Sequence, residues 1–129
     1  MKKEIVKTWI KALDSNDFAT IENLMAHNYQ FRNPLAPVPI SGKEHLGMMY
    51  MMKSAFEAEH QIDMIIEEEN YVVISAKWKG KHIGEFNGVP ATEKVIEFYL
   101  IDCFYILDGK VLEHHIEFNP MHLMQITQS

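Results

Sequence analysis

The first half of the chain repeats its hydrophobic positions at the spacing of α-helices. Apolar residues recur every three or four positions from Ile5 to Leu13 and stop at the polar run D-S-N-D, which predicts a first helix with one buried stripe. A second helix follows, with Asp17 at its N-cap. Its buried face is expected to hold Phe18, Ile21, Leu24 and Met25. The short link between the two helices makes them a hairpin.

Prolines and a capping motif define the next two segments. The run H-N-Y-Q-F-R-N-P, which starts at His27, leaves the helical spacing, and prolines at positions 34, 37 and 39 predict an irregular loop. Ser41 followed by Glu44 is a capping-box pattern. We therefore expect a Met-rich helix from residue 42 to Phe56.

From His60 onward the pattern changes to that of strands. The segments Q-I-D-M-I-I-E and V-V-I-S-A-K-W flank a turn near Asn70, a loop spans residues 87–93, and two further strands flank Asp108-Gly109. Helices followed by hairpin-linked strands predict an antiparallel sheet covered on one face, an α+β fold, in a single domain over residues 1–129.

Composition and charge argue against several classes of partner. Hydrophobic residues make up 47% and charged residues 23% of the chain, as in ordinary globular proteins. The net charge of -6 and the scattered lysines argue against nucleic acid and against an anionic membrane. Lys7 and Lys11 interrupt the start of the chain before a signal peptide forms, and no apolar run approaches the roughly 18 residues of a membrane span, so we expect a cytoplasmic location.

The last hairpin allows two registers, which bring different side chains together. A two-residue turn at Asp108-Gly109 places Asp102 opposite His115, whereas a type I turn with Gly109 as the bulge residue places Asp102 opposite His114. We prefer the second register because it produces one nearly pure apolar face. That face consists of Phe98, Leu100, Asp102 and Phe104 with Leu112, His114, Ile116 and Phe118.

A carboxylate and an imidazole on an apolar face are costly to bury unless they satisfy each other or line a wet cavity. Asp102 and His114 are therefore candidates for a general acid–base pair, because such a pair can exchange protons near neutral pH. A structural hydrogen bond without any substrate is the competing interpretation. His82 shares strand parity with Trp78 and is the third candidate, unless a bend at Gly80 reverses its direction.

Other chemistries find little support in the sequence. His114 and His115 are neighbours on a strand and point to opposite faces, so they do not grip one metal ion, and His115 with Glu117 has no identifiable third ligand. No G-x-S-x-G elbow, P-loop or dinucleotide fingerprint occurs, so we expect no cofactor. Cys103 is a single cysteine in a predicted strand and is expected to be a buried hydrophobe.

Three runs of residues carry a resemblance to a known family. They are H-I-G-E-F-N-G-V-P-A-T from His82, I-D-C-F-Y-I-L-D-G-K-V-L-E-H-H from Ile101 and, more weakly, the run from His27 to Pro34. With these runs the chain resembles the SnoaL-like polyketide cyclase family of the nuclear-transport-factor-like, ketosteroid-isomerase-like superfamily, nearly from end to end.

The resemblance implies a curved sheet wrapped into a cone by helices, a deep apolar cavity and a homodimer formed through the sheet. It also implies an acidic acid–base catalyst on the last strand, beside a polar residue on the preceding strand. Asp102 matches the polar position, and Ile116 matches the acidic one. An isoleucine cannot move a proton, so the family's aldol cyclisation does not transfer directly.

We therefore expect a pocket for a small, apolar, carbonyl-bearing molecule. Asp102 is the expected base or acceptor, His114 its proton partner and His82 a donor to a substrate oxygen. The alternative is a non-catalytic ligand-binding or dimer-interaction domain. A cavity of roughly 300 Å³ or more, reached by Asp102 and His114, favours a ligand site. The expected pocket-forming residues are Arg32, Tyr50, Trp78, Phe104, Ile116 and Phe118.

Overall fold

Strict alternation of buried and exposed residues marks the two central strands of the protein. The computed structural model describes residues 1–128. In β4 (Tyr71–His82) and β5 (Val95–Leu107) the even-numbered side chains are buried, while the odd-numbered ones face outward or lie partly exposed. Because side chains alternate along a strand, this pattern gives the sheet one apolar face and one solvated face.

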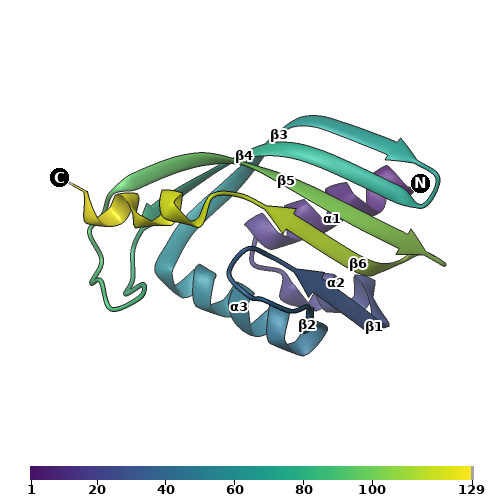
Figure 1. Ribbon diagram of the computed structural model, residues 1–129, viewed down its shortest axis with the longest axis horizontal. Coiled ribbons are helices and arrows are strands. Elements are labelled where there is room, and N and C mark those ends of the chain that lie inside the picture. The colour runs from purple at the N-terminus through teal and green to yellow at the C-terminus, as the bar shows by residue number, and fades with distance from the viewer. Residues whose placement is uncertain (129) are drawn as a thin grey trace.

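Six strands form one curved, open sheet (Figure 1). The remaining strands are β1 (Met25–Arg32), β2 (Ile40–Ser41), β3 (Phe56–Glu68) and β6 (Lys110–Glu117), and the order across the sheet is β2-β1-β6-β5-β4-β3. Neighbours are antiparallel except β1 and β6, which run parallel. Phe56, expected to end a helix, begins β3 instead.

Three helices cover the apolar face of the sheet (Figure 1). They are α1 (Lys2–Asp14), α2 (Phe18–Leu24) and α3 (Gly42–Ala55). The predicted caps are present: Asp17 accepts a hydrogen bond from the Thr20 amide, and Ser41 and Glu44 form a reciprocal capping box. A 3-10 helix, η1 (Pro120–Thr127), follows β6 and packs on β5. The predicted α+β fold is confirmed.

β1 lies where the irregular loop starting at His27 is predicted, so that prediction is wrong. Tyr29 and Phe31 are buried, and Gln30 and Arg32 between and after them are exposed. The alternation in β1 is short, and the strand that pairs with β1, β6, lies about 80 positions later in the chain. Tertiary pairing therefore decides this segment, and β1 and β2 interrupt the predicted order of helices first and strands afterwards.

The β5–β6 hairpin follows neither predicted register along its whole length. Asp108 and Gly109 form a two-residue turn, with φ of 52° and 75°, between paired Leu107 and Lys110. A bulge then leaves Leu112 as an extra residue. Beyond it Asp102 faces Ile116 and Phe104 faces His114, so the preferred pairing of Asp102 with His114 is wrong. The bulge nevertheless restores the predicted parity, because it turns the even-numbered residues of β6 back toward the apolar face.

Within residues 1–128, no helix is long and apolar enough to cross a membrane.

Candidate functional site

A cavity of about 210 Å³ lies between the helices and the apolar face of the sheet. Its walls are mostly apolar and include Trp9, Phe31, Met49, Trp78 and Phe98. The volume falls short of the roughly 300 Å³ that small-molecule sites usually have. The polar residues among its lining are Asp14, Asn16, Asn33, His45, Lys53, Glu57, His60, Asp102 and His114.

Asp102 and His114 form the most deeply buried ionisable pair of this cavity. Nε2 of His114 lies 2.6 Å from Oδ1 of Asp102, and the side chains are 6% and 3% exposed. The two residues are diagonal neighbours across β5 and β6, which is within reach of long side chains. Phe104 stacks under the imidazole with ring centroids 4.1 Å apart, and Trp9 contacts it edge-on. The ring is therefore held in one orientation.

Tyr29 and His45 extend this pair into a hydrogen-bonded chain of four side chains. The Tyr29 hydroxyl lies 2.7 Å from Nδ1 of His45 and 3.3 Å from Nδ1 of His114. His45 stacks flat on Phe31. The sequence reasoning missed both residues, although each carried a signal. Tyr29 begins the short alternation of β1, and His45 lies one helical turn before the buried Met49 of α3.

Burial keeps Tyr29 and His45 of this hydrogen-bonded series uncharged. It lowers the pKa of His45 well below the usual value, and the nearby His114 lowers it further. Burial also raises the pKa of Tyr29 well above 10, with the charge of Asp102 adding to the effect. Near neutral pH, Tyr29 is therefore a phenol and His45 a neutral imidazole.

One proton order satisfies all four groups. Neutral His114 donates Nε2–H to Asp102 and accepts the Tyr29 O–H at Nδ1, while Nδ1–H of His45 donates to the Tyr29 oxygen. In this order Nε2 of His45 is an acceptor. Tyr29 and His114 thus connect His45 to Asp102 through an unbroken series of hydrogen bonds.

His82 does not line the cavity, which contradicts the prediction that it projects there. Its parity is as predicted, and its side chain is fully buried, but the ring packs against Phe56. Nδ1 lies 2.9 Å from the Thr92 hydroxyl and accepts the Thr92 amide at 3.1 Å. His82 therefore fastens the loop after β4 to the end of that strand.

Of the predicted pocket-forming residues, Trp78, Ile116 and Phe118 line the cavity. Phe104 is fully buried but lies beneath the imidazole of His114 instead of at the cavity wall. Its contribution is therefore to the orientation of His114.

Arg32 and Tyr50 do not reach the cavity, so their predicted placement is wrong. Arg32 follows Phe31 on β1 and points to the opposite, exposed side. Tyr50 is 55% exposed and packs on Phe18 with ring centroids 4.6 Å apart. The α3 residues that do line the cavity are His45, Met48, Met49, Met51, Met52 and Lys53.

The prediction that His114 and His115 point to opposite faces is confirmed. His115 lies on the outer face, where Nε2 is 2.6 Å from Oε2 of Glu117. In the part of the chain that the structure describes, no three side chains of His, Cys, Asp or Glu converge as metal ligands.

The fold and the site together define a small α+β protein with a buried carboxylate–imidazole pair in a mostly apolar cavity. The chain belongs to the SnoaL-like polyketide cyclase family, whose profile matches residues 3–126. This agrees with the family that the sequence motifs indicate.

Two curated relatives are cyclases. The chain is 30% identical over 110 residues to aklanonic acid methyl ester cyclase DnrD of Streptomyces peucetius, covering 81% of this chain and 70% of the relative. It is 27% identical over 115 residues to aklanonic acid methyl ester cyclase DauD of Streptomyces sp. (strain C5), covering 86% and 71%. Among solved structures, AclR of Streptomyces galilaeus matches with a TM-score of 0.90 and 22% identity, over 99% of this chain and 82% of that one. The structural match supports the fold.

Proposed function

We propose that the protein is a cofactor-free acid–base enzyme of the cyclase or isomerase type. It removes and returns a proton at a carbon beside a carbonyl group of a compact, mostly apolar molecule. The observation that carries this proposal is the Asp102–His114 pair, 2.6 Å apart, at the wall of a mostly apolar cavity. Such a pair is costly to bury, and proton transfer is the chemistry that it can supply.

The position of Asp102 supports a catalytic carboxylate shifted by one strand. The resemblance to the family's cyclases implies an acid at Ile116, and Asp102 is the direct cross-strand partner of Ile116. Side chains that face each other across two strands have Cβ atoms about 5 Å apart. The Asp102 carboxylate therefore reaches nearly the same region of the cavity as a carboxylate at Ile116.

Each polar group then has a role. Asp102 accepts the substrate proton or orients His114, and His114 stores the proton as an imidazolium. Tyr29 and His45 supply a second route to the same imidazole, because Tyr29 contacts its other ring nitrogen and His45 contacts the Tyr29 hydroxyl. His82 has no part in this chemistry.

The cavity limits the size of the substrate. An apolar protein cavity of about 150 Å³ holds one benzene ring, so 210 Å³ suits a molecule of one or two rings. The two cyclase relatives act on aklanonic acid methyl ester. We infer a smaller carbonyl compound of the same general chemistry for this chain.

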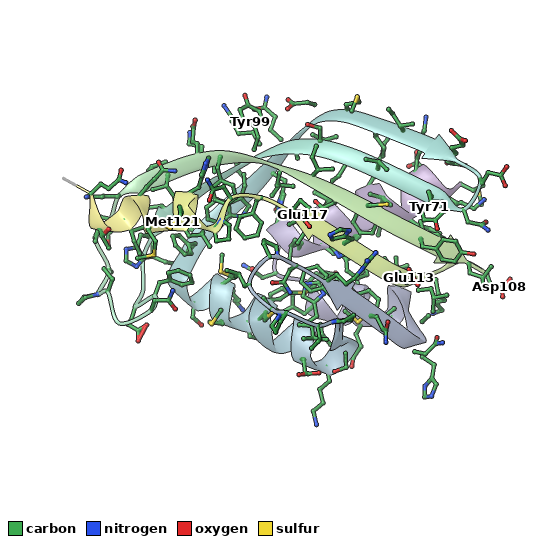
Figure 2. All side chains as sticks on the ribbon, in the orientation of Figure 1. Tyr71, Tyr99, Asp108, Glu113, Glu117 and Met121 are labelled. Atoms are coloured by element: carbon green, nitrogen blue, oxygen red, sulfur yellow. The ribbon has the colours of Figure 1, made fainter. Side chains whose placement is uncertain are left out.

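The outer face of the sheet supports the expected homodimer. Tyr71, Tyr99 and Ile101 are 49%, 63% and 44% exposed on or beside the central strands, and both tyrosines are labelled in Figure 2. Large apolar side chains gathered on one face of a sheet favour burial against a partner. We propose a second copy of this chain in that place, and we retain the expectation of a cytoplasmic location.

A non-catalytic ligand-binding domain is the second candidate. It is favoured by the hydrogen bonds of His114, because both ring nitrogens already have partners within the chain. In that case the network only satisfies its own buried groups.

Proton exchange separates the two candidates without knowledge of the natural substrate. 1-Indanone, a two-ring ketone, is incubated with the protein in D2O, and NMR follows the replacement of its α-hydrogens by deuterium. An acid–base enzyme accelerates the exchange above the buffer rate in proportion to protein concentration. A binding domain perturbs the indanone resonances upon binding but leaves the exchange rate at that of the buffer.

A further inference from the structure

A second carboxylate–imidazole pair lines the cavity, apart from the chain that ends at Asp102. Asp14 is the last residue of α1, and His60 lies on β3. Nδ1 of His60 is 2.6 Å from Oδ1 of Asp14, and the backbone amide of His60 donates to Oδ2 at 2.8 Å. One carboxylate thus holds one histidine at two points, and both residues line the cavity.

The two pairs lie at different ends of the cavity. His60 faces Trp78 across β3 and β4, and Trp78 faces Phe98 across β4 and β5. Asp102 lies four residues beyond Phe98 on β5, which is about 13 Å along an extended strand. Aromatic rings surround the imidazole of the Asp102–His114 pair.

His60 differs from His114 in having a ring nitrogen to spare. Both nitrogens of His114 are hydrogen-bonded. In His60 the Asp14 carboxylate occupies Nδ1. Within residues 1–128, Nε2 of His60 makes no hydrogen bond, and this atom is not fully enclosed by the protein. Since a carboxylate can only accept, it keeps the proton of the neutral ring on Nδ1 and leaves a lone pair on Nε2. The same arrangement orients the imidazole of a Ser-His-Asp triad.

From these contacts we infer that Asp14 and His60 form a second acceptor site, which binds a hydroxyl group of the ligand through Nε2 of His60. The ligand class is accordingly an apolar ring compound with a proton-donating hydroxyl at the end opposite to its reacting carbonyl. This inference rests on the proposed function in placing a carbonyl-bearing ligand in the cavity.

A purely structural role is the competing explanation, because the same contacts fasten the end of α1 to β3. His60→Asn separates the two roles. The asparagine side-chain amide can still donate to Asp14 from the place of Nδ1, but it has no group in the place of Nε2. Asp14→Asn is the second variant: its amide can donate to Nδ1 and thereby move the ring proton to Nε2, which turns the acceptor into a donor.

The test measures binding of two probes of nearly equal shape, 4-ethylphenol and 4-ethyltoluene, by isothermal titration calorimetry. The quantity compared is the ratio of their dissociation constants. We expect His60→Asn to shift this ratio against the phenol by about fivefold, the usual effect of one hydrogen bond. Asp14→Asn should shift it by less, because a phenol oxygen can also accept a hydrogen bond from Nε2–H. Asp102→Asn probes the other end of the cavity, and the surface control His115→Asn should leave the ratio unchanged.

Three results overturn the inference. An unchanged ratio in both Asp14 and His60 variants shows a structural fastening only. A shift in Asp102→Asn alone places the hydroxyl at the other end of the cavity. Failure of wild-type protein to bind either probe shows that no ligand site of this size exists. Because binding is measured, a failure of indanone exchange does not affect the outcome.

Discussion

Asp102 and His114 are hydrogen-bonded at 2.6 Å although the strands do not pair them directly: Asp102 faces Ile116, and His114 faces Phe104. The diagonal contact follows from the bulge at Leu112, which displaces β6 by one residue. Without the bulge, the two-residue turn would place His115 beside Asp102 and send His114 to the outer face. The bulge is therefore what builds the buried pair.

Removing the Asp102 carboxylate should destabilise the protein more than removing an equivalent exposed one. Asp102→Ala leaves Nε2 of His114 buried without its partner, and we expect the free energy of unfolding to fall by about 1–3 kcal/mol. Glu117→Ala is the matched control, because its 2.6 Å contact with His115 is exposed to solvent. It should cost under about 1 kcal/mol. Urea denaturation measures both, and equal losses would contradict the assigned difference in burial.

Moving the carboxylate by one cross-strand step should restore part of the activity. Asp102→Asn is expected to abolish indanone exchange, and adding Ile116→Asp returns a carboxylate to the neighbouring position. We expect the double variant to regain at least about a tenth of the wild-type rate, because either position reaches the same region of the cavity. The exchange assay measures this. If the double variant is as inactive as Asp102→Asn alone, a carboxylate at position 116 cannot replace the one at position 102.

His45 should make the protein less stable in mild acid. Its pKa in the folded chain is lowered, so below its unfolded value of about 6.5 the unfolded chain binds a proton that the folded chain does not. The stabilisation of the folded state by neutral His45 is therefore complete above about pH 6.5, and it is lost as the pH falls below that value. His45→Asn keeps a hydrogen bond to Tyr29 from the place of Nδ1 but does not titrate. Between pH 7.5 and 5, its free energy of unfolding should fall less steeply than that of the wild type, by up to about 1.4 kcal/mol per pH unit.

Parallel curves for the two proteins would rule out this role of His45. Chemical denaturation at a series of pH values gives the curves.

The outer face of the sheet should hold the dimer together. Tyr99→Lys places a charge among apolar side chains of the central strands, and we expect the molar mass in solution to halve. Leu35→Lys, which also replaces an exposed apolar side chain but in the loop before β2, is the control. Light scattering coupled to size-exclusion chromatography measures the masses. If the Tyr99 variant remains a dimer, the interface lies elsewhere.

Local sequence patterns predicted most of the fold. The helices follow from their 3.6-residue spacing and from the caps at Asp17 and Ser41, and the central strands follow from strict alternation. β1 was not predictable in this way, because its pairing with β6 joins distant parts of the chain. The bulge at Leu112 leaves no distinctive residue pattern either.

The site was only half predictable for the same reason. Asp102 and His114 belong to one hairpin, so their parity could be derived from the sequence. Tyr29 and His45 join them from β1 and α3, and Asp14 meets His60 across 46 positions. Contacts between residues so far apart in the sequence depend on how the helices pack on the sheet, and no local sequence pattern encodes that packing.

The conspicuous run around His82 has a structural explanation. His82 binds both the hydroxyl and the amide of Thr92, and Gly84 lies so close to the Ser54 carbonyl oxygen that an added Cβ would lie 2.1 Å from it. The histidine, glycine and threonine of this motif therefore shape the loop after β4. These three residues therefore explain the conformation of this loop, and they do not line the cavity.

The most direct test of the proposed function is the rate of deuterium exchange into 1-indanone by wild-type protein and by Asp102→Asn, with Glu117→Gln as the control on the outer face. We expect Asp102→Asn to lower the protein-dependent rate at least about 100-fold, the usual contribution of a positioned acid or base, and Glu117→Gln to leave it unchanged. A wild-type rate no higher than that of the buffer, or an Asp102→Asn rate equal to the wild type, would contradict the assignment of acid–base chemistry to this pair.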